Sequence, residues 1–416
     1  MFKRFNLDDY QTSVRQEVLA GLVTFFSVSY ILFVNPMILQ EAGVPSEYSI
    51  YATIFIAVIG SFLMGWFANA PLIMAPGMGE NAFFTFTLVG AIGLSWQQSL
   101  AVVVISGALF TLLAFSGVMK LFSESISASL KLAITSGIGF FLILIGLENM
   151  GILVNGGLEW NTISIIGLLL LTVLKKKNIK GSFLIAIIFT AVLYWVFNYP
   201  LFEPVSFDMS ALLSYGELVR AADYSQLFTV ELLLGVFSLT MLLMFETIGM
   251  IEAFLKDAGR AEPSYKVGAV TGLLSGLLGT SSAIPVAENG AGIAEGGRTG
   301  LTAVTASCLF LLALFVAPFL SYIPSEAVGP VIVATGASMA LSGVTIRVNH
   351  AIEWLPILLI IVLIPVTGSI VDGMAYGFIL YPFIQLLIGN KEKLNAIQWI
   401  ISGLFFLTLL STWLFI

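Results

Sequence analysis

Two Glu-Asn pairs stand inside long apolar stretches of the chain, where ionisable side chains are rare. Glu80 and Asn81 follow the proline and glycines of the segment APGMGENAFFTF, and Glu288 and Asn289 belong to the segment SAIPVAENGAG. A third acid, Glu246, lies in the apolar segment LLMFETIGMIEAF. A carboxylate inside a membrane is costly unless it is protonated, bound to a ligand or placed in a water-filled cavity. These acids therefore indicate a polar site that binds a ligand or a proton.

Two other interpretations of these residues are a helix cap and an enzyme active site. Glu80 and Asn81 could simply cap a helix, but two matching pairs in one chain favour a functional site. An enzyme would need a nucleophile–base pair or a cluster of metal ligands, and histidine and cysteine occur only once each. The sequence therefore predicts no enzymatic activity, no metal site and no cofactor.

The composition is that of a polytopic membrane protein. The 416 residues are 58% hydrophobic and 10% charged, whereas soluble domains carry about 25% charged residues. Apolar runs of about 20 residues, long enough to cross a bilayer as helices, recur along the chain. A single membrane domain and no nucleic-acid partner are expected. The predicted spans are residues 18–36, 48–68, 71–91, 99–119, 129–148, 162–174, 181–198, 229–252, 265–279, 280–300, 301–321, 327–343, 352–366 and 371–388, with a further apolar segment at 397–416.

The distribution of basic residues supports this order of spans. With the N-terminus in the cytoplasm, only Arg220 of the 17 basic residues falls in an outside loop. An error in the number of spans would reverse every later loop and scatter the positive charges. The sequence therefore predicts a multi-pass plasma-membrane protein with a cytoplasmic N-terminus.

The spans form two sets of seven, separated by an acidic connection at residues 199–228. An odd number of spans in each half gives the halves opposite orientations, which is typical of transporters with inverted repeats. The third and tenth spans match each other, since each has a proline, small residues and a Glu-Asn pair. Proline disfavours a continuous helix, so each of these spans is predicted to be a short extended segment followed by a half-helix. The half-helix N-termini would then face the centre of the protein.

Several segments resemble the signature segments of the AzgA-like purine permeases, a branch of the nucleobase:cation symporters with the fold of the uracil permease. The resemblance extends from Gly21 to about Leu387. It rests on the segments GLVTFFSVSYILFVNP, APGMGENAFFTF, LKLAITSGIGFF, FETIG and AGIAEGGRTGLTAV.

The resemblance implies an all-α fold of fourteen spans, with a core domain at 18–119 and 229–321 and a gate domain at 129–198 and 327–416. It also implies proton-coupled import of hypoxanthine, guanine, adenine or xanthine. The partners expected from it are a purine nucleobase, the proton and the lipid bilayer, and a homodimer is compatible with it. A transporter of the same fold for another small nitrogen heterocycle or an anion, or a channel, is the alternative. The acids at the starts of the half-helices disfavour an anion as the substrate.

Family roles can be assigned only to the matching positions. The asparagine of the third-span motif is Asn81, and the acids of the eighth and tenth spans are Glu246 and Glu288, all expected to contact the base. Glu246 and Glu288 are also the candidates for proton coupling. Phe83 and Phe84 are candidates for stacking on the ring, and plain packing is the alternative interpretation. Additional residues expected at the site are Thr247, Ala287 and Asn289.

The sequence departs from the usual family pattern at three places. Glu246 replaces a more usual aspartate, and Glu80 stands where an apolar residue is usual. The tenth-span stretch Ile284 to Ala287 is apolar where polar residues are usual. By the repeat argument Glu80 lies opposite Glu288, shares its cavity and modifies proton affinity or base preference without being the main contact of the base.

Overall fold

The computed structural model describes residues 2–117, 119, 126–154, 156–198, 210–225, 228–255, 257–320, 323–348, 350–390 and 394–415. Some residues on which sequence predictions rest lie outside these ranges. They are Glu203 and Asp208 of the acidic connection and the basic residues Lys120, Lys256, Lys391 and Lys393.

Helices account for nearly all of the regular structure, as the sequence predicts. The helices of the first half are α1 (Val14–Val28), α2 (Ile31–Glu41), α3 (Ser46–Phe67), α4 (Met78–Ala82), α5 (Trp96–Phe115), α7 (Ala128–Asn149), α8 (Thr162–Lys176) and α9 (Ser182–Asn198). The later helices are α10 (Ser210–Val219), α11 (Val230–Phe254), α12 (Ala258–Leu277), α13 (Asn289–Ala294), α14 (Gly300–Leu312), α15 (Ala317–Leu320), α16 (Ser325–Ala340), α17 (Trp354–Thr367), α18 (Ile370–Leu387) and α19 (Ala396–Phe415). A π-helix, Phe83–Ala91, continues α4.

Among the described residues, seven helical segments are long and apolar enough to cross a membrane. The first of these joins α1 and α2, which are separated by a break at Ser29 and Tyr30. Most of the other predicted spans are shorter helices or are interrupted by extended backbone, whereas α12 is a continuous helix of 20 residues that is less apolar. Two small features were not predicted: α10 lies in the acidic connection, and strands β2 (Leu153–Val154) and β3 (Gly157–Leu158) form a hairpin.

The predicted extended segments of the third and tenth spans are present and pair with each other. Strand β1 (Met74–Pro76) runs antiparallel to β4 (Ala283–Pro285), with Ala75 opposite Ile284. All six residues of these strands are buried. Extended backbone at this depth is tolerated because protein surrounds it and its polar groups find partners. The amide of Gly77, for example, donates to the carbonyl of Ser282 at 3.2 Å.

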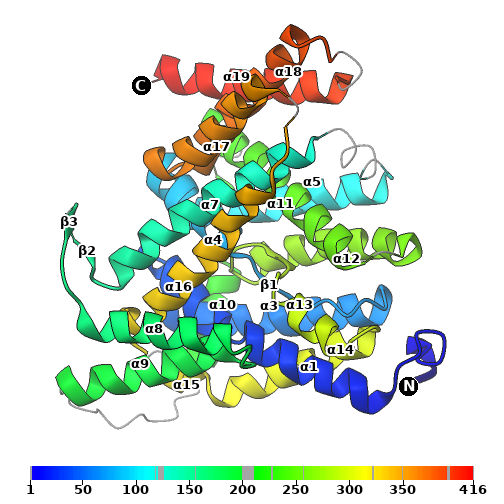
Figure 1. Cartoon of the computed structure of the whole chain (residues 1–416), viewed down its shortest axis with the longest axis vertical. Coiled ribbons are helices and arrows are strands. Elements are labelled where there is room, and N and C mark those ends of the chain that lie inside the picture. The colour runs from blue at the N-terminus through cyan, green and yellow to red at the C-terminus, as the bar shows by residue number, and fades with distance from the viewer. Residues whose placement is uncertain are drawn as a thin grey trace.

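The helices pack in two groups around this crossing. In one group α12 packs on α3, α5 and α11, α11 packs on α5, and α14 packs on α3 and α1. In the other group α7 packs on α16 and α17, while α8 and α9 pack on α16 and α18 packs on α17 and α19. The helices α7 and α16 approach closely because both carry glycine at the contact: a Cβ at Gly336 would stand 2.7 Å from the carbonyl oxygen of Gly139. Strand β1 and helix α4 lie in the middle of the molecule (Figure 1).

Candidate binding site

A cavity of about 390 Å³ lies beside the crossing of the two broken spans. This volume falls in the range of about 300–1,000 Å³ that is typical of small-molecule sites. Its wall combines the ends of β1 and β4, the break between α1 and α2, and parts of α7, α8, α9, α11 and α16. The lining residues are Val28, Tyr30, Ile31, Pro76, Gly77, Met78, Gly79, Thr135, Lys175, Phe183, Glu246, Met250, Ile284, Val286, Ala287, Glu288, Thr335, Ser338, Met339 and Ser342.

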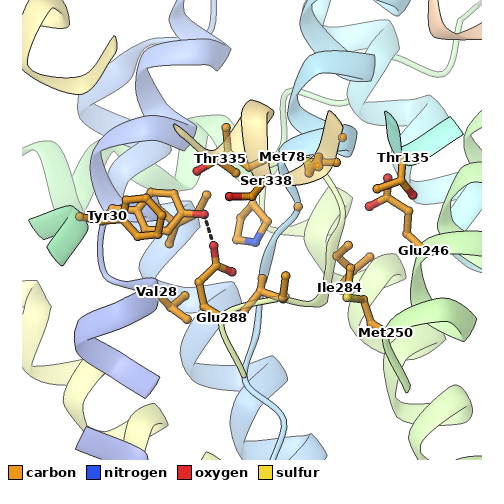
Figure 2. A pocket seen from close by; sticks show the side chains of 18 of the residues that line it. Val28, Tyr30, Met78, Thr135, Glu246, Met250, Ile284, Glu288, Thr335 and Ser338 are labelled. Carbon is orange, nitrogen blue, oxygen red and sulfur yellow. Dashed lines mark hydrogen bonds between the residues drawn. The ribbon is translucent and has the colours of Figure 1, made fainter. Parts of the chain in front are cut away.

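Two carboxyl groups face this cavity from different sides. Figure 2 shows Glu288 on one side of the cavity and Glu246 on the other, with Met250 and Ile284 between Glu288 and Glu246. Glu288 directly precedes α13, and Glu246 belongs to α11. The predicted placement of acids from the eighth and tenth spans around one cavity therefore matches the geometry, although their contact with a base stays a prediction.

Glu288 is held in place by a residue that the sequence analysis did not single out. The hydroxyl of Tyr30 donates a hydrogen bond of 2.6 Å to Oε1 of Glu288 (Figure 2). Tyr30 stands at the break between α1 and α2, and its ring packs against Phe183 of α9 at 4.8 Å between centroids. The only sequence signal for this role was its position in the segment SVSYILFVNP.

A lysine also reaches the cavity. Lys175, in the last turn of α8, lines the cavity and interacts electrostatically with Glu288. Its Nζ donates to Oγ of Ser338 at 3.1 Å and lies 4.9 Å from the centroid of the Phe183 ring. The sequence predicts Lys175 just beyond the sixth span, in a cytoplasmic loop. Helix α8 continues to Lys176, and Lys175 therefore lies at the edge of the cavity, far in sequence from Glu288.

The repeat argument predicts that Glu80 shares the cavity of Glu288, but the structure places Glu80 elsewhere. It is 1% exposed and lies outside the cavity lining. Its carboxyl group interacts directly with that of Glu246, at hydrogen-bonding range. The pseudosymmetry of the two halves relates the Glu-Asn pairs but does not bring them into contact. The acid on the long helix α11 fills the space beside Glu80 instead.

Asn81 belongs to a buried polar network next to the crossing. Oγ of Ser281 donates to Oδ1 of Asn81 at 2.5 Å. Asn35 lies beside Ser281 and donates through Nδ2 to Oγ1 of Thr53 at 2.7 Å. Nδ2 of Asn81 is buried and has no partner among the described residues. Asn81 is therefore anchored on one side of its amide and has a free donor on the other, but it lies behind the cavity wall.

The remaining site candidates occupy different environments. Ala287 lines the cavity, whereas Phe83 is fully buried outside it. Oγ1 of Thr247 is buried without a partner among the described residues. Asn289 clamps the crossing: its Oδ1 accepts from the amide of Ile73 at 2.7 Å, and its Nδ2 donates to the carbonyl of Ile73 at 3.0 Å. Both ends of the Asn289 amide are thus used by the fold.

The charged groups at the site suit a neutral ligand with hydrogen-bond donors and acceptors. Two carboxyl groups and one ammonium group face a wall that is otherwise mostly apolar. Within the described ranges, no group of three or more His, Cys, Asp or Glu residues could hold a metal ion. The arrangement can accept N–H donors at two places and donate to an oxygen or nitrogen acceptor at a third.

Comparison with known proteins gives a consistent result. Residues 15–412 match the family model described as "Permease family". Three similar proteins are the nucleobase transporter PlAzg2 of Paenibacillus larvae (39% identical, covering 88% of this chain and 76% of the relative), the adenine permease AdeP of Escherichia coli (32%, 97% and 94%) and the guanine/hypoxanthine permease PbuO of Bacillus subtilis (32%, 97% and 99%). Among solved structures, the transmembrane domain of the cyanobacterial bicarbonate transporter BicA has a similar fold, with a TM-score of 0.65 at 16% identity over 87% of this chain and 96% of that domain.

Proposed function

This chain belongs to the Permease family, and from that premise we propose that it imports purine nucleobases across the plasma membrane together with protons. The family and its relatives are transporters, so the chain is an integral membrane transporter and not an enzyme. The printed names of the relatives include adenine and guanine/hypoxanthine permeases. They support a purine base as the substrate.

The observation that carries the proposal is the pair of carboxyl groups, Glu246 and Glu288, on different walls of one cavity. A purine presents alternating N–H donors and ring-nitrogen or carbonyl acceptors along its edge. A carboxylate accepts up to two parallel N–H bonds, so the two acids can hold two edges of a flat base. The apolar wall around Ile284, Val286 and Met250 packs on the faces of the ring.

Lys175 supplies the donor that the carboxylates lack. Its ammonium group faces the same cavity as Glu288. A carbonyl oxygen of guanine, hypoxanthine or xanthine can accept from it, while adenine has an amino group at that position. This geometry favours oxopurines over a simple anion, because an anion would have to bind between two acids.

The helix packing suggests how the cavity changes its access. We assign residues 18–119 and 229–321 to the core domain and 129–198 and 327–416 to the gate domain. The cavity is built from both, since Glu246 and Glu288 belong to the first part and Lys175, Phe183 and Ser338 to the second. Movement of one part against the other around the bound base would open the cavity alternately to each side. The N-terminus is assigned to the cytoplasm.

Binding and coupling can be tested separately. Purified full-length protein should bind radiolabelled hypoxanthine, guanine or adenine, and an excess of an unlabelled purine should compete. Glu246→Gln and Glu288→Gln should each abolish accumulation in proteoliposomes, since an amide cannot exchange a proton and has half the acceptor capacity. Glu262→Gln is the matched control, because the Glu262 side chain is 71% exposed and pairs with Lys266 outside the site. Full accumulation in both site variants would remove these acids from the proposed mechanism.

A further inference from the structure

The wall of the cavity at Glu246 has a second carboxyl group behind it. Glu80 is almost fully buried, and its carboxyl group lies at hydrogen-bonding range of Glu246. Neither carboxyl oxygen of Glu80 accepts a hydrogen bond from a donor among the described residues, and neither does Oε1 of Glu246. The two groups cannot both be ionised at low cost, because these three oxygens lack donors and the two charges would repel each other.

Gly77 and Gly79, which lack side chains, leave the space that the two carboxyl groups occupy. A Cβ at Gly79 would stand 2.5 Å from Oε1 of Glu246, and a Cβ at Gly77 would overlap Oε2 of Glu80. The two glycines in the segment PGMGEN are therefore the positions where a larger residue would displace one carboxyl group or the other. The side chain of Ile284 closes the remaining space at Gly77, where its Cδ1 would stand 2.8 Å from a Cβ.

No described cation neutralises the pair. Helix α4 packs against α2, α7, α11 and the π-helix, and α11 packs in addition against α5, α12, α13 and β4. Lys131 of α7 interacts electrostatically with Glu252, and Lys175 interacts electrostatically with Glu288. None of the other ionisable groups on these elements has an electrostatic interaction with Glu80 or Glu246. These groups are Glu41, Glu148, Glu231, Arg260, Glu262, Tyr265 and Lys266.

We propose that Glu80 and Glu246 form one proton site, in which a single proton is shared between the two carboxyl groups and exchanges through the cavity face of Glu246. Binding forms one O–H bond on one carboxylate, which then donates to an oxygen of the other, and release returns that proton to water in the cavity. The pair with its proton carries one negative charge. Glu246 can then accept an N–H group of the substrate while Glu80 holds the proton behind it.

The pair makes Glu80 a positioning and proton-holding residue that does not touch the substrate. This role for the pair in transport rests on the proposed function, whereas the shared proton itself does not. The glutamates at positions 80 and 246 come from α4 and α11, and each brings its carboxyl group within reach of the other.

The first test needs no substrate. Infrared difference spectra of full-length protein in liposomes, recorded while the pH is varied, report the carbonyl stretch of protonated carboxyl groups. We expect such a band at neutral pH in the wild type and its loss in Glu80→Gln and in Glu246→Gln. Glu288→Gln is the control and should keep the band. A band that survives in Glu80→Gln, or its absence from the wild type, would overturn the shared proton. Loss of the band on addition of sodium chloride at constant pH would identify a sodium site in place of the proton site. That result would also overturn the proposal.

The second test measures the pH dependence of purine uptake in proteoliposomes. In Glu80→Leu, Glu246 loses its neighbouring negative charge and binds a proton less readily. The pH midpoint of uptake should therefore move toward acid by about one unit or more, which is the coupling expected of directly interacting carboxyl groups. An unchanged midpoint in a folded Glu80→Leu protein would contradict the proposal. If the infrared band is present but no purine is bound by the wild type, the proposed function fails and the proton site stands.

Discussion

The hydroxyl of Tyr30 donates to Oε1 of Glu288 at 2.6 Å, and this contact joins the break between α1 and α2 to the segment that follows β4. This hydrogen bond restricts the orientation of the Glu288 carboxyl group at the wall of the cavity. A hydrogen bond to a charged group contributes about 1.5–3 kcal/mol. The orientation of the main candidate for base binding thus depends on a residue from the opposite half of the repeat.

Replacement of Tyr30 tests this dependence. Tyr30→Phe should keep the fold and the packing against Phe183 but leave Glu288 free to rotate. The apparent affinity for the base should fall by roughly tenfold or more, since about 1.4 kcal/mol corresponds to a factor of ten. The measurement is the concentration dependence of uptake, with the thermal stability of the purified variant as the control. An unchanged affinity in a stable variant would show that Tyr30 does not position Glu288.

Gly79 offers a steric test of the Glu246 position. A methyl group at residue 79 would stand 2.5 Å from Oε1 of Glu246, so Gly79→Ala should displace that carboxyl group and strongly reduce purine binding. Gly249→Ala is the matched control, since Gly249 lies on the same helix as Glu246 and a Cβ there meets nothing within 4 Å. Equal binding by the two variants would contradict the assignment of Glu246 to the site.

Asn289 should behave as a structural residue. Its amide forms two hydrogen bonds to Ile73 across the crossing. Removing them leaves the buried amide of Ile73 without its partner, while the carbonyl of Ile73 still accepts from the amide of Val286 at 3.4 Å. Asn289→Ala should lower the free energy of unfolding by about 1–3 kcal/mol for each group left unsatisfied. The order of preference among purines should stay the same. A stable Asn289→Ala protein with an altered preference would instead make Asn289 a contact of the base.

Lys175 and Lys176 form a matched pair for testing the cationic group. Both stand in the last turn of α8, but only Lys175 lines the cavity. Lys175→Gln should weaken competition by guanine and hypoxanthine roughly tenfold relative to adenine, because a charged donor to the carbonyl is lost. Lys176→Gln should leave the ratio unchanged. The same ratio in both variants would exclude a contact between Lys175 and the substrate.

The broken spans could be predicted because their signal is local. Proline at 76 and 285, together with small residues and a following Glu-Asn pair, disfavours a continuous helix in both segments. The structure confirms an extended segment and a half-helix at each place. The order of the helices also follows from local apolar runs, and most predicted bounds differ from the observed ones by a few residues.

The partners of the acids could not be predicted, because they depend on how distant segments meet. Internal symmetry relates Glu80 to Glu288 but does not determine which side chain fills the space between helices, and Glu246 fills it. Lys175 belongs by composition to a basic loop, and only the end of α8 at the cavity edge makes it part of the site. Asn289 matches Asn81 in sequence, yet it binds the backbone of Ile73 while Asn81 binds Ser281.

The most direct test of the central claim is accumulation of a labelled purine by proteoliposomes that contain the purified protein. With acid outside and sodium absent, we predict accumulation above equilibrium that collapses when a protonophore is added, and competition by at least one of hypoxanthine, guanine, adenine and xanthine. Empty liposomes and liposomes with Glu288→Gln protein should show none. Accumulation that needs sodium and ignores the proton gradient would contradict the coupling, and no uptake of any purine by folded protein would contradict the function itself.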